Sequence, residues 1–187
     1  MTKKVLIPIA NGSEEIEAVC TIDVLRRAGA DVTVASVEDS QQVTASRGVE
    51  LVADCLIADC ADATFDLIAV PGGMPGAEHL RDSATLTRLL LAQQKAGRLY
   101  AAICAAPVVV LQHHGLLQGR QATCHPSVAG QLRSPQAMEQ RVVADGPCIT
   151  SRAPGTAIEF ALKLVEALYG ADKAVQVGEH MLAKKEG

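Results

Sequence analysis

The chain has 187 residues, of which 49% are hydrophobic and 20% are charged, and its formal net charge at pH 7 is -4. This length suits a single domain over residues 1–187 with a substantial core, and the acidic balance argues against a nucleic-acid backbone as partner. With no Trp, two Tyr and two Phe, the chain has few side chains that could stack on bases, so we expect no sequence-specific nucleic-acid binding.

The N-terminal segment and the cysteines indicate the compartment. Residues 1–10 contain a basic pair followed by an apolar run that is too short for the core of a signal peptide. The longest uncharged apolar run, residues 99–111, is shorter than the roughly 20 residues of a membrane-spanning helix. The six cysteines include no CxxC pair. We therefore predict a cytoplasmic protein with reduced thiols, no membrane segment and no structural zinc.

Apolar and amphipathic runs alternate along most of the chain. In order, they predict a strand over 5–10, a helix capped by Ser13 and ended by Gly29, a strand over 31–37, a weak ribbon over 41–54, a strand over 65–70, a helix over 83–96, a strand over 99–103, a helix over 107–114, short strands over 121–124, 142–144 and 149–151, and helices over 156–169 and 172–182. This alternation predicts an α/β sandwich, with a mostly parallel sheet and helices on both faces.

Polar or glycine-rich segments follow five of these predicted strands. They are residues 11–17, 71–76, 104–107, 125–126 and 152–155. Because the carboxyl ends of parallel strands meet at one edge of the sheet, we expect these segments to lie together there. That edge is where sheets of this kind bind ligands, so it is the predicted site.

Cys104 is the candidate nucleophile at this edge. It falls where the strand 99–103 turns into a helix, so backbone amides of the helix N-terminus should lie near its thiol and lower the thiol pKa. A strand-to-helix turn of this kind is also the device of a nucleophile elbow. The alternative is a buried cysteine that acts as a small hydrophobic residue. The other five cysteines are interpreted in that second way.

Two neighbouring motifs leave alternatives open. The run Pro71-Gly72-Gly73 could present a backbone N–H to an oxyanion, or it could be a simple tight turn. Glu14, Glu15 and Glu17 all fall in the first turn of a helix, where the helix dipole favours a carboxylate. The pattern therefore does not choose among the three.

The basic candidates are equally open. His125 could be a general base or proton carrier, or a solvated turn residue before a proline. Arg47 and Arg152 could orient an anionic substrate or reach a partner subunit, or they could form ordinary surface ion pairs. We favour the surface interpretation for both arginines.

Four motifs together resemble the ThiJ/PfpI superfamily, and in particular its Parkinsonism-associated deglycase branch. They are GSEEIE at 12–17, VPGG at 70–73, AAICAAP at 101–107 and TSRAPGT at 150–156. The motifs occur in the family's order over nearly the whole chain. The resemblance implies a flavodoxin-like sandwich, usually a homodimer, with an acidic cysteine that is easily oxidised to a sulfinate.

The resemblance also implies roles for individual residues. Cys104 matches the family's cysteine, and Glu17 matches a carboxyl that is protonated and donates a hydrogen bond to the sulfur. The backbone amides of Gly73 and Ala105 match the anion-binding pair near the sulfur, and His125 matches a nearby histidine. Two further basic positions, near the subunit interface and the mouth of the site in relatives, are matched by Arg27 and Arg47.

The resemblance implies a function in two forms. The first is a cofactor-independent and metal-free deglycase or glyoxalase, in which Cys104 attacks methylglyoxal, glyoxal or their early protein adducts and a 2-hydroxy acid is released. The second is a redox-sensing, chaperone-like stress protein that uses the same cysteine. Peptidase activity is disfavoured, because Ala105 stands where the peptidase branch has a histidine directly after the nucleophile.

Overall fold

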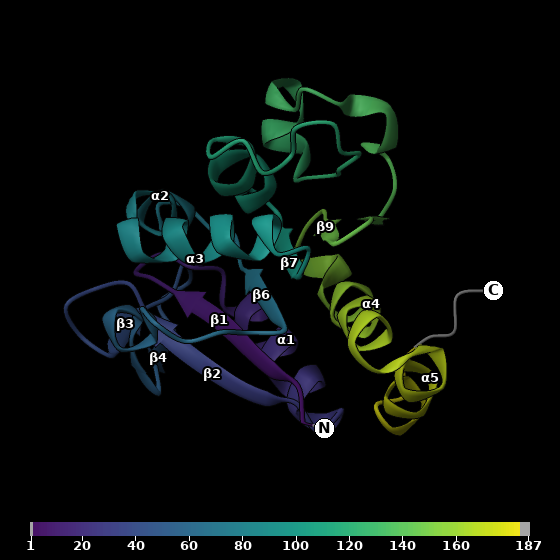
Figure 1. Ribbon diagram of the computed structural model, residues 1–187, viewed down its shortest axis with the longest axis horizontal. Coiled ribbons are helices and arrows are strands. Elements are labelled where there is room, and N and C mark those ends of the chain that lie inside the picture. Colours follow the sequence, from purple (N-terminus) through teal and green to yellow (C-terminus); the bar gives the residue numbers. More distant parts are fainter. Residues whose placement is uncertain (1, 184–187) are drawn as a thin grey trace.

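A seven-stranded sheet forms the centre of the protein (Figure 1), in a computed structural model that describes residues 2–183. The strand order is β5-β2-β1-β6-β7-β9-β8, and only β8 is antiparallel to its neighbour. The strands are β1 (Lys4–Ile9), β2 (Asp31–Ser36), β5 (Cys55–Leu56), β6 (Leu67–Val70), β7 (Leu99–Ile103), β8 (Val142–Asp145) and β9 (Cys148–Ser151). The prediction of a mostly parallel, flavodoxin-like α/β sheet is confirmed.

Helices cover both faces of the sheet. One face carries α1 (Glu15–Arg27) and α4 (Ala157–Tyr169), with α5 (Ala171–His180) packed against α4. The other face carries α2 (Gly76–Asp82), α3 (Ala84–Lys95) and a π-helical segment, Pro107–Gln112.

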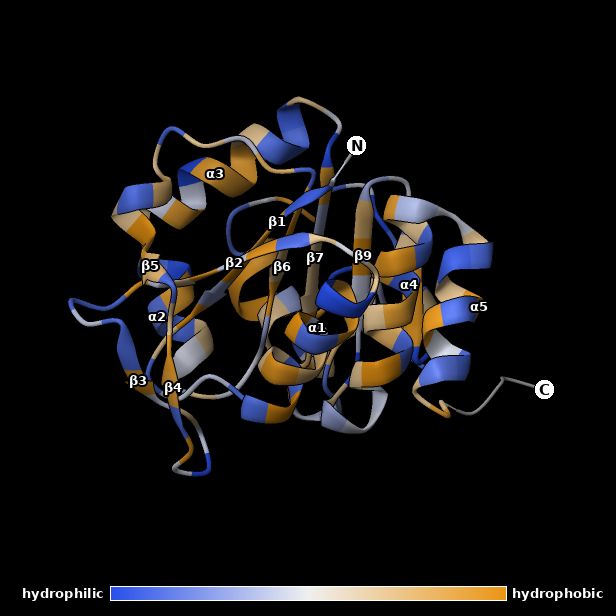
Figure 2. Ribbon diagram, turned by 90° about the horizontal axis from the view of Figure 1, so that it is seen from below, coloured by the Kyte–Doolittle hydropathy of each residue, from blue (hydrophilic) through white to orange (hydrophobic). Residues whose placement is uncertain are grey.

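Neighbouring residues of a strand enter different cores. Val5 and Ile7 of β1 belong to the core under α1 and α4, whereas Leu6 belongs to the core under α2 and α3. This is why the strands are apolar without alternation. In Figure 2 the central strands are largely in hydrophobic colours. The hairpin of β3 (Gln42–Thr44) and β4 (Glu50–Val52) projects beyond them and corresponds to the weak ribbon predicted over 41–54.

Three local features differ from the predictions. Residues 121–124 form no strand, because the backbone N–H groups of Gln121 and Thr123 donate to the side chains of Asp145 and Thr150 instead of to a neighbouring strand. Ser13 does not cap α1: its hydroxyl accepts from the Ala10 N–H, and the Glu14 side chain is the cap. The short helix α2 was not predicted.

Candidate active site

Strand register brings the predicted segments together at the carboxyl edge of the sheet. Val70 of β6 is aligned with Ala102 of β7, and Ile103 is aligned with Ser151 of β9. The segments that follow these strands therefore begin at the same level. Two backbone hydrogen bonds add the remaining segments: the Glu14 N–H donates to the Gly72 carbonyl (2.9 Å), and the His125 N–H donates to the Cys104 carbonyl (2.7 Å).

Cys104 occupies an unusual backbone conformation at this edge. Its φ is 66°, in the left-handed region that residues with a Cβ rarely adopt. The turn is held by the Cys104 N–H, which donates to the Ser151 carbonyl at 3.0 Å. Strain of this kind is typical of functional sites, where the surrounding structure holds it. The residue is 9% exposed, so the sulfur lies at the edge of the core.

Glu17 is the carboxyl that faces Cys104. The side chain is fully buried, and its Oε2 accepts a 2.8 Å hydrogen bond from the Gly72 N–H. Among the described residues, Oε1 has no nitrogen or oxygen partner. Besides the Gly72 amide, the Cys104 thiol interacts with this carboxyl, and the charge of Glu14 has a smaller effect on it. Burial raises the pKa of Glu17 to about 7, against the opposing effect of the hydrogen bonds from Gly72 and Cys104. A buried carboxyl with a free oxygen is suited to hold a proton near neutral pH.

The pKa of Cys104 differs from the expectation that neighbouring amides would lower it. The amides of Gly73 and Ala105 do favour the thiolate, but burial and the Glu17 carboxylate outweigh them and raise the thiol pKa to about 12. Three causes raise the thiol pKa: burial, the charge of Glu17 and the hydrogen bond with Glu17. The last two apply when the Glu17 carboxylate is ionised. When Glu17 is protonated its charge is absent, and burial alone opposes the two amides.

The structure also separates the three glutamates that the sequence left equivalent. The Glu14 side chain caps α1 by accepting from the Glu17 N–H at 2.8 Å. Glu15 points to the hairpin, where its carboxylate accepts from the Ser46 hydroxyl and the Arg47 N–H. Burial would raise the pKa of Glu15, but the hydrogen bonds that it accepts lower it overall. Only Glu17 reaches the thiol.

Glycine is required at two positions of the 71–73 turn. A Cβ on Gly72 would lie 2.6 Å from the Cys104 Cβ and 3.0 Å from the Glu17 carboxylate. Gly73 has a φ of +90°, and a Cβ there would meet the Gly12 carbonyl and the Glu14 amide. The family resemblance implied Gly73 as an amide donor, but the role of Gly72 in holding Glu17 was missed, because the contact joins residues 55 positions apart.

The basic candidates have different partners in the structure. The His125 backbone adjoins Cys104, while its ring Nδ1 accepts from the Ser127 N–H (3.1 Å) and lies 2.7 Å from the Ser127 hydroxyl. Arg27 is exposed at the far end of α1 and pairs with Asp23 at 2.6 Å. The exposed Arg47 guanidinium donates to the Ser46 carbonyl at 3.4 Å. Arg152 pairs with Glu139 at 3.2 Å, the surface interpretation that we favoured.

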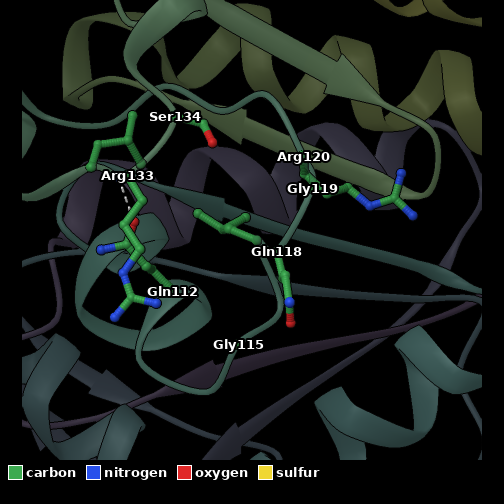
Figure 3. A pocket seen from close by; sticks show the side chains of 9 residues that line it. Gln112, Gly115, Gln118, Gly119, Arg120, Arg133 and Ser134 are labelled. Atoms are coloured by element: carbon green, nitrogen blue, oxygen red, sulfur yellow. Dashed lines mark hydrogen bonds between the residues drawn. The ribbon is translucent and has the colours of Figure 1, made fainter.

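A cavity of about 280 Å³ lies away from these residues. It is lined by Gln112, Gly115, Leu117, Gln118, Gly119, Arg120, Leu132, Arg133 and Ser134 (Figure 3). None of the predicted site residues lines it. In residues 2–183 no group of three His, Cys, Asp or Glu side chains is placed to hold a metal ion, and no helix of that part combines the length and apolar character needed to cross a bilayer.

Comparison with known proteins identifies relatives over nearly the full chain. Residues 3–167 match the DJ-1/PfpI family. The chain is 52% identical over 177 residues to Protein DJ-1 homolog B of Arabidopsis thaliana, covering 94% of this chain but only 40% of that protein. It is 40% identical over 171 residues to the Glutathione-independent glyoxalase DJR-1.2 of Caenorhabditis elegans, covering 90% of this chain and 89% of that protein.

The fold has a near match among solved structures. The structure of oxidized Toxoplasma gondii DJ-1 superposes with a TM-score of 0.96 at 52% identity, covering 98% of this chain and 100% of that chain. The Drosophila melanogaster DJ-1beta structure gives a TM-score of 0.95 at 42% identity, covering 99% and 100%.

Proposed function

Because the chain belongs to the DJ-1/PfpI family, we propose that it is a cysteine-dependent, cofactor-independent glyoxalase or deglycase acting on methylglyoxal, glyoxal or their early adducts. The observation that carries the proposal is the buried pair of Glu17 and Cys104, with the amides of Gly73 and Ala105 beside the sulfur. The glyoxalase name of the Caenorhabditis elegans relative supports the same chemistry.

The reactive form in this proposal carries its single proton on Glu17 and its negative charge on the Cys104 sulfur. The thiolate attacks the aldehyde carbon of methylglyoxal, and a hemithioacetal forms. The amides of Gly73 and Ala105 then bind the developing oxyanion. This distribution of charge uses the free Oε1 of Glu17 as a donor to the sulfur, which an ionised carboxylate could not be.

The remaining steps move protons and release the product. A proton passes from C1 to C2 of the adduct, with Glu17 or His125 as the carrier, and a 2-hydroxy thioester results. Water cleaves this thioester, which frees the 2-hydroxy acid and restores the Cys104 thiol. With the hemiaminal that methylglyoxal forms with a protein amine, the thiolate displaces the amine from C1, the amine leaves with a proton from Glu17 or His125, and the same hemithioacetal forms.

The test compares wild type with Cys104→Ala and Cys104→Ser on methylglyoxal and on a glycated peptide, in a buffer free of primary amines. We expect both variants to lose lactate formation, while Cys20→Ser, a half-buried cysteine on α1, retains it. Retention of most turnover by Cys104→Ala would overturn the mechanism.

A second candidate function is redox sensing or chaperone-like activity through the same thiol. The two amides that would hold an oxyanion would equally hold the oxygens of a Cys104 sulfinate, and the Toxoplasma gondii relative was solved as an oxidized protein. A gain of two oxygens confined to Cys104 after mild peroxide, together with negligible dicarbonyl turnover by the reduced protein, would favour this function.

We also propose a cytoplasmic homodimer. Exposed apolar side chains gather around the first turns of α1, with Ile16 57% and Val19 47% exposed, and Val49 of the adjoining hairpin turn is 47% exposed. The Glu15 carboxylate ties that turn to α1 through Ser46 and Arg47. Several large apolar side chains exposed on neighbouring segments are typical of a subunit interface.

A further inference from the structure

Two cysteines outside the active site have their sulfurs in contact. The Cys55 and Cys60 Sγ atoms lie 3.7 Å apart. Cys55 opens β5, the edge strand of the sheet, and Cys60 ends the 3-10 turn Ile57–Cys60 that follows it. Within residues 2–183, these are the two cysteines whose sulfurs touch.

The segment between the two sulfurs is held in place by hydrogen bonds. The Leu56 N–H donates to the Asp59 carboxylate at 3.2 Å, across the turn. Cys55 is aligned with Ala35 of β2, which fixes the strand end of the turn. The other end is fixed by Arg88 of α3, whose guanidinium donates to the Ala61 carbonyl at 3.3 Å. The two thiols are therefore held together by the fold before any oxidation.

The two sulfurs differ in their access to solvent. Cys60 is 4% exposed and lies in the core under α2 and α3, while Cys55 is half-buried at the sheet edge. Burial, with the neighbouring Cys55 thiol second, raises the pKa of Cys60 to about 12. Cys60 is thus suited to remain a protonated thiol, and Cys55 is the sulfur that a small oxidant reaches.

We propose that Cys55 and Cys60 form a redox-active dithiol that closes to a reversible disulfide when the protein meets a peroxide. Hydrogen peroxide oxidises the Cys55 thiol to a sulfenic acid and is reduced to water. The Cys60 sulfur then attacks the sulfenic sulfur while its proton passes to the sulfenic oxygen, which leaves as a second water, and the S–S bond forms. The two thiols together lose two hydrogens and two electrons. A dithiol reductant restores both thiols.

This dithiol is separate from the Cys104 site. Cys60 lies in the core on one face of the sheet and Cys104 in the core on the other, so neither sulfur can reach Cys104 without unfolding. The two sites also differ in reversibility, because a sulfinate on Cys104 is not returned to the thiol by a dithiol reductant. The proposal does not depend on the glyoxalase function.

The test uses the full chain with Cys104→Ala, so that oxidation of Cys104 does not obscure the result. After hydrogen peroxide, denaturation and labelling with N-ethylmaleimide, we expect two fewer labels per chain and a peptide in which Cys55 is joined to Cys60. Dithiothreitol should restore both labels.

Two single variants keep the test decisive. In Cys60→Ser, the crosslinked peptide should vanish and Cys55 should accumulate oxygen instead, whereas Cys148→Ser, which alters a buried cysteine of β9, should leave the crosslink unchanged. Circular dichroism checks that each variant is folded. Full labelling of Cys55 and Cys60 after peroxide, or a disulfide from Cys55 to any other cysteine, would overturn the proposal.

Discussion

The Gly72 N–H donates a 2.8 Å hydrogen bond to the Glu17 Oε2 atom, between two residues that lie 55 positions apart in the chain. This bond occupies Oε2, whereas Oε1 has no nitrogen or oxygen partner in the described part of the chain. Glycine at position 72 also leaves the space in which Cys104 and Glu17 approach each other. The turn after β6 thus fixes the geometry of a pair that belongs to two other elements.

Gly72→Ala adds a single methyl group, but it should disrupt the site more than so small a change suggests. The new Cβ would lie 2.6 Å from the Cys104 Cβ and 3.0 Å from the Ala105 amide nitrogen, so Cys104 or Ala105 must move. We expect a loss of about 1–3 kcal/mol in the free energy of unfolding, with most of the dicarbonyl turnover lost. Urea unfolding and lactate assays measure the two effects. Gly130→Ala, where a Cβ meets nothing within 4 Å, is the matched control.

Glu17→Gln should slow the reaction of Cys104 with iodoacetamide near neutral pH. The amide of glutamine donates a weaker hydrogen bond to sulfur than a protonated carboxyl does, so the thiolate loses stabilisation. The rate is measured as a function of pH by intact mass. If Glu17 were instead an ionised carboxylate beside a neutral thiol, its removal would accelerate alkylation, so the direction of the change decides which atom holds the proton.

The contribution of Glu17 to the stability of the wild type should fall as the pH rises from about 4.5 to about 8. The folded-state pKa of Glu17 is raised to about 7 from 4.5, so the folded state keeps a proton that the unfolded state has released. The stabilisation is complete below the unfolded pKa and is lost as the pH passes the folded pKa, by up to about 3 kcal/mol. Urea unfolding at several pH values measures it. A Glu17→Gln variant with the same pH slope as the wild type would contradict the assignment.

His125→Ala should lower kcat without preventing peroxide oxidation of Cys104. If the ring carries a proton during turnover, its removal should cost roughly 100-fold in kcat, the lower end of general acid–base effects. Ser127→Ala is the control, because it removes the hydroxyl beside Nδ1 while keeping the ring and the N–H that bonds to it. An unchanged kcat in His125→Ala would show that the ring acts only as the cap of the 3-10 turn Pro126–Gln131.

Val19→Asp should convert the protein from dimer to monomer. Val19 is 47% exposed on α1 beside Ile16, and a carboxylate buried in an apolar interface would lack a partner. Light scattering after gel filtration measures the molar mass. Leu91→Asp, on α3 at the opposite face of the sheet, is 43% exposed in the wild type and should leave the mass unchanged. Equal masses for both variants would place the interface elsewhere or show that none forms.

Local patterns sufficed for most of the secondary structure. The apolar strands follow from the few residues around each of them, and so does the end of α1 before Gly29. The predicted strand at 121–124 failed because its backbone donors bind Asp145 and Thr150, which lie more than 20 residues further along the chain. Helix α2 was missed because only seven residues carry its pattern.

The amino-acid pattern alone predicted the α/β class, the meeting of five segments at one edge of the sheet, and the position of Cys104 at the strand-to-helix turn. It could not distinguish Glu17 from Glu14 and Glu15, nor predict that burial and Glu17 would outweigh the helix amides in raising the pKa of Cys104. Those outcomes depend on distances between segments far apart in the chain, and on the exclusion of water from the space between them. The folded arrangement sets both, because a carboxyl and a thiol affect each other's protonation through their separation and burial, which the spacing along the chain does not fix.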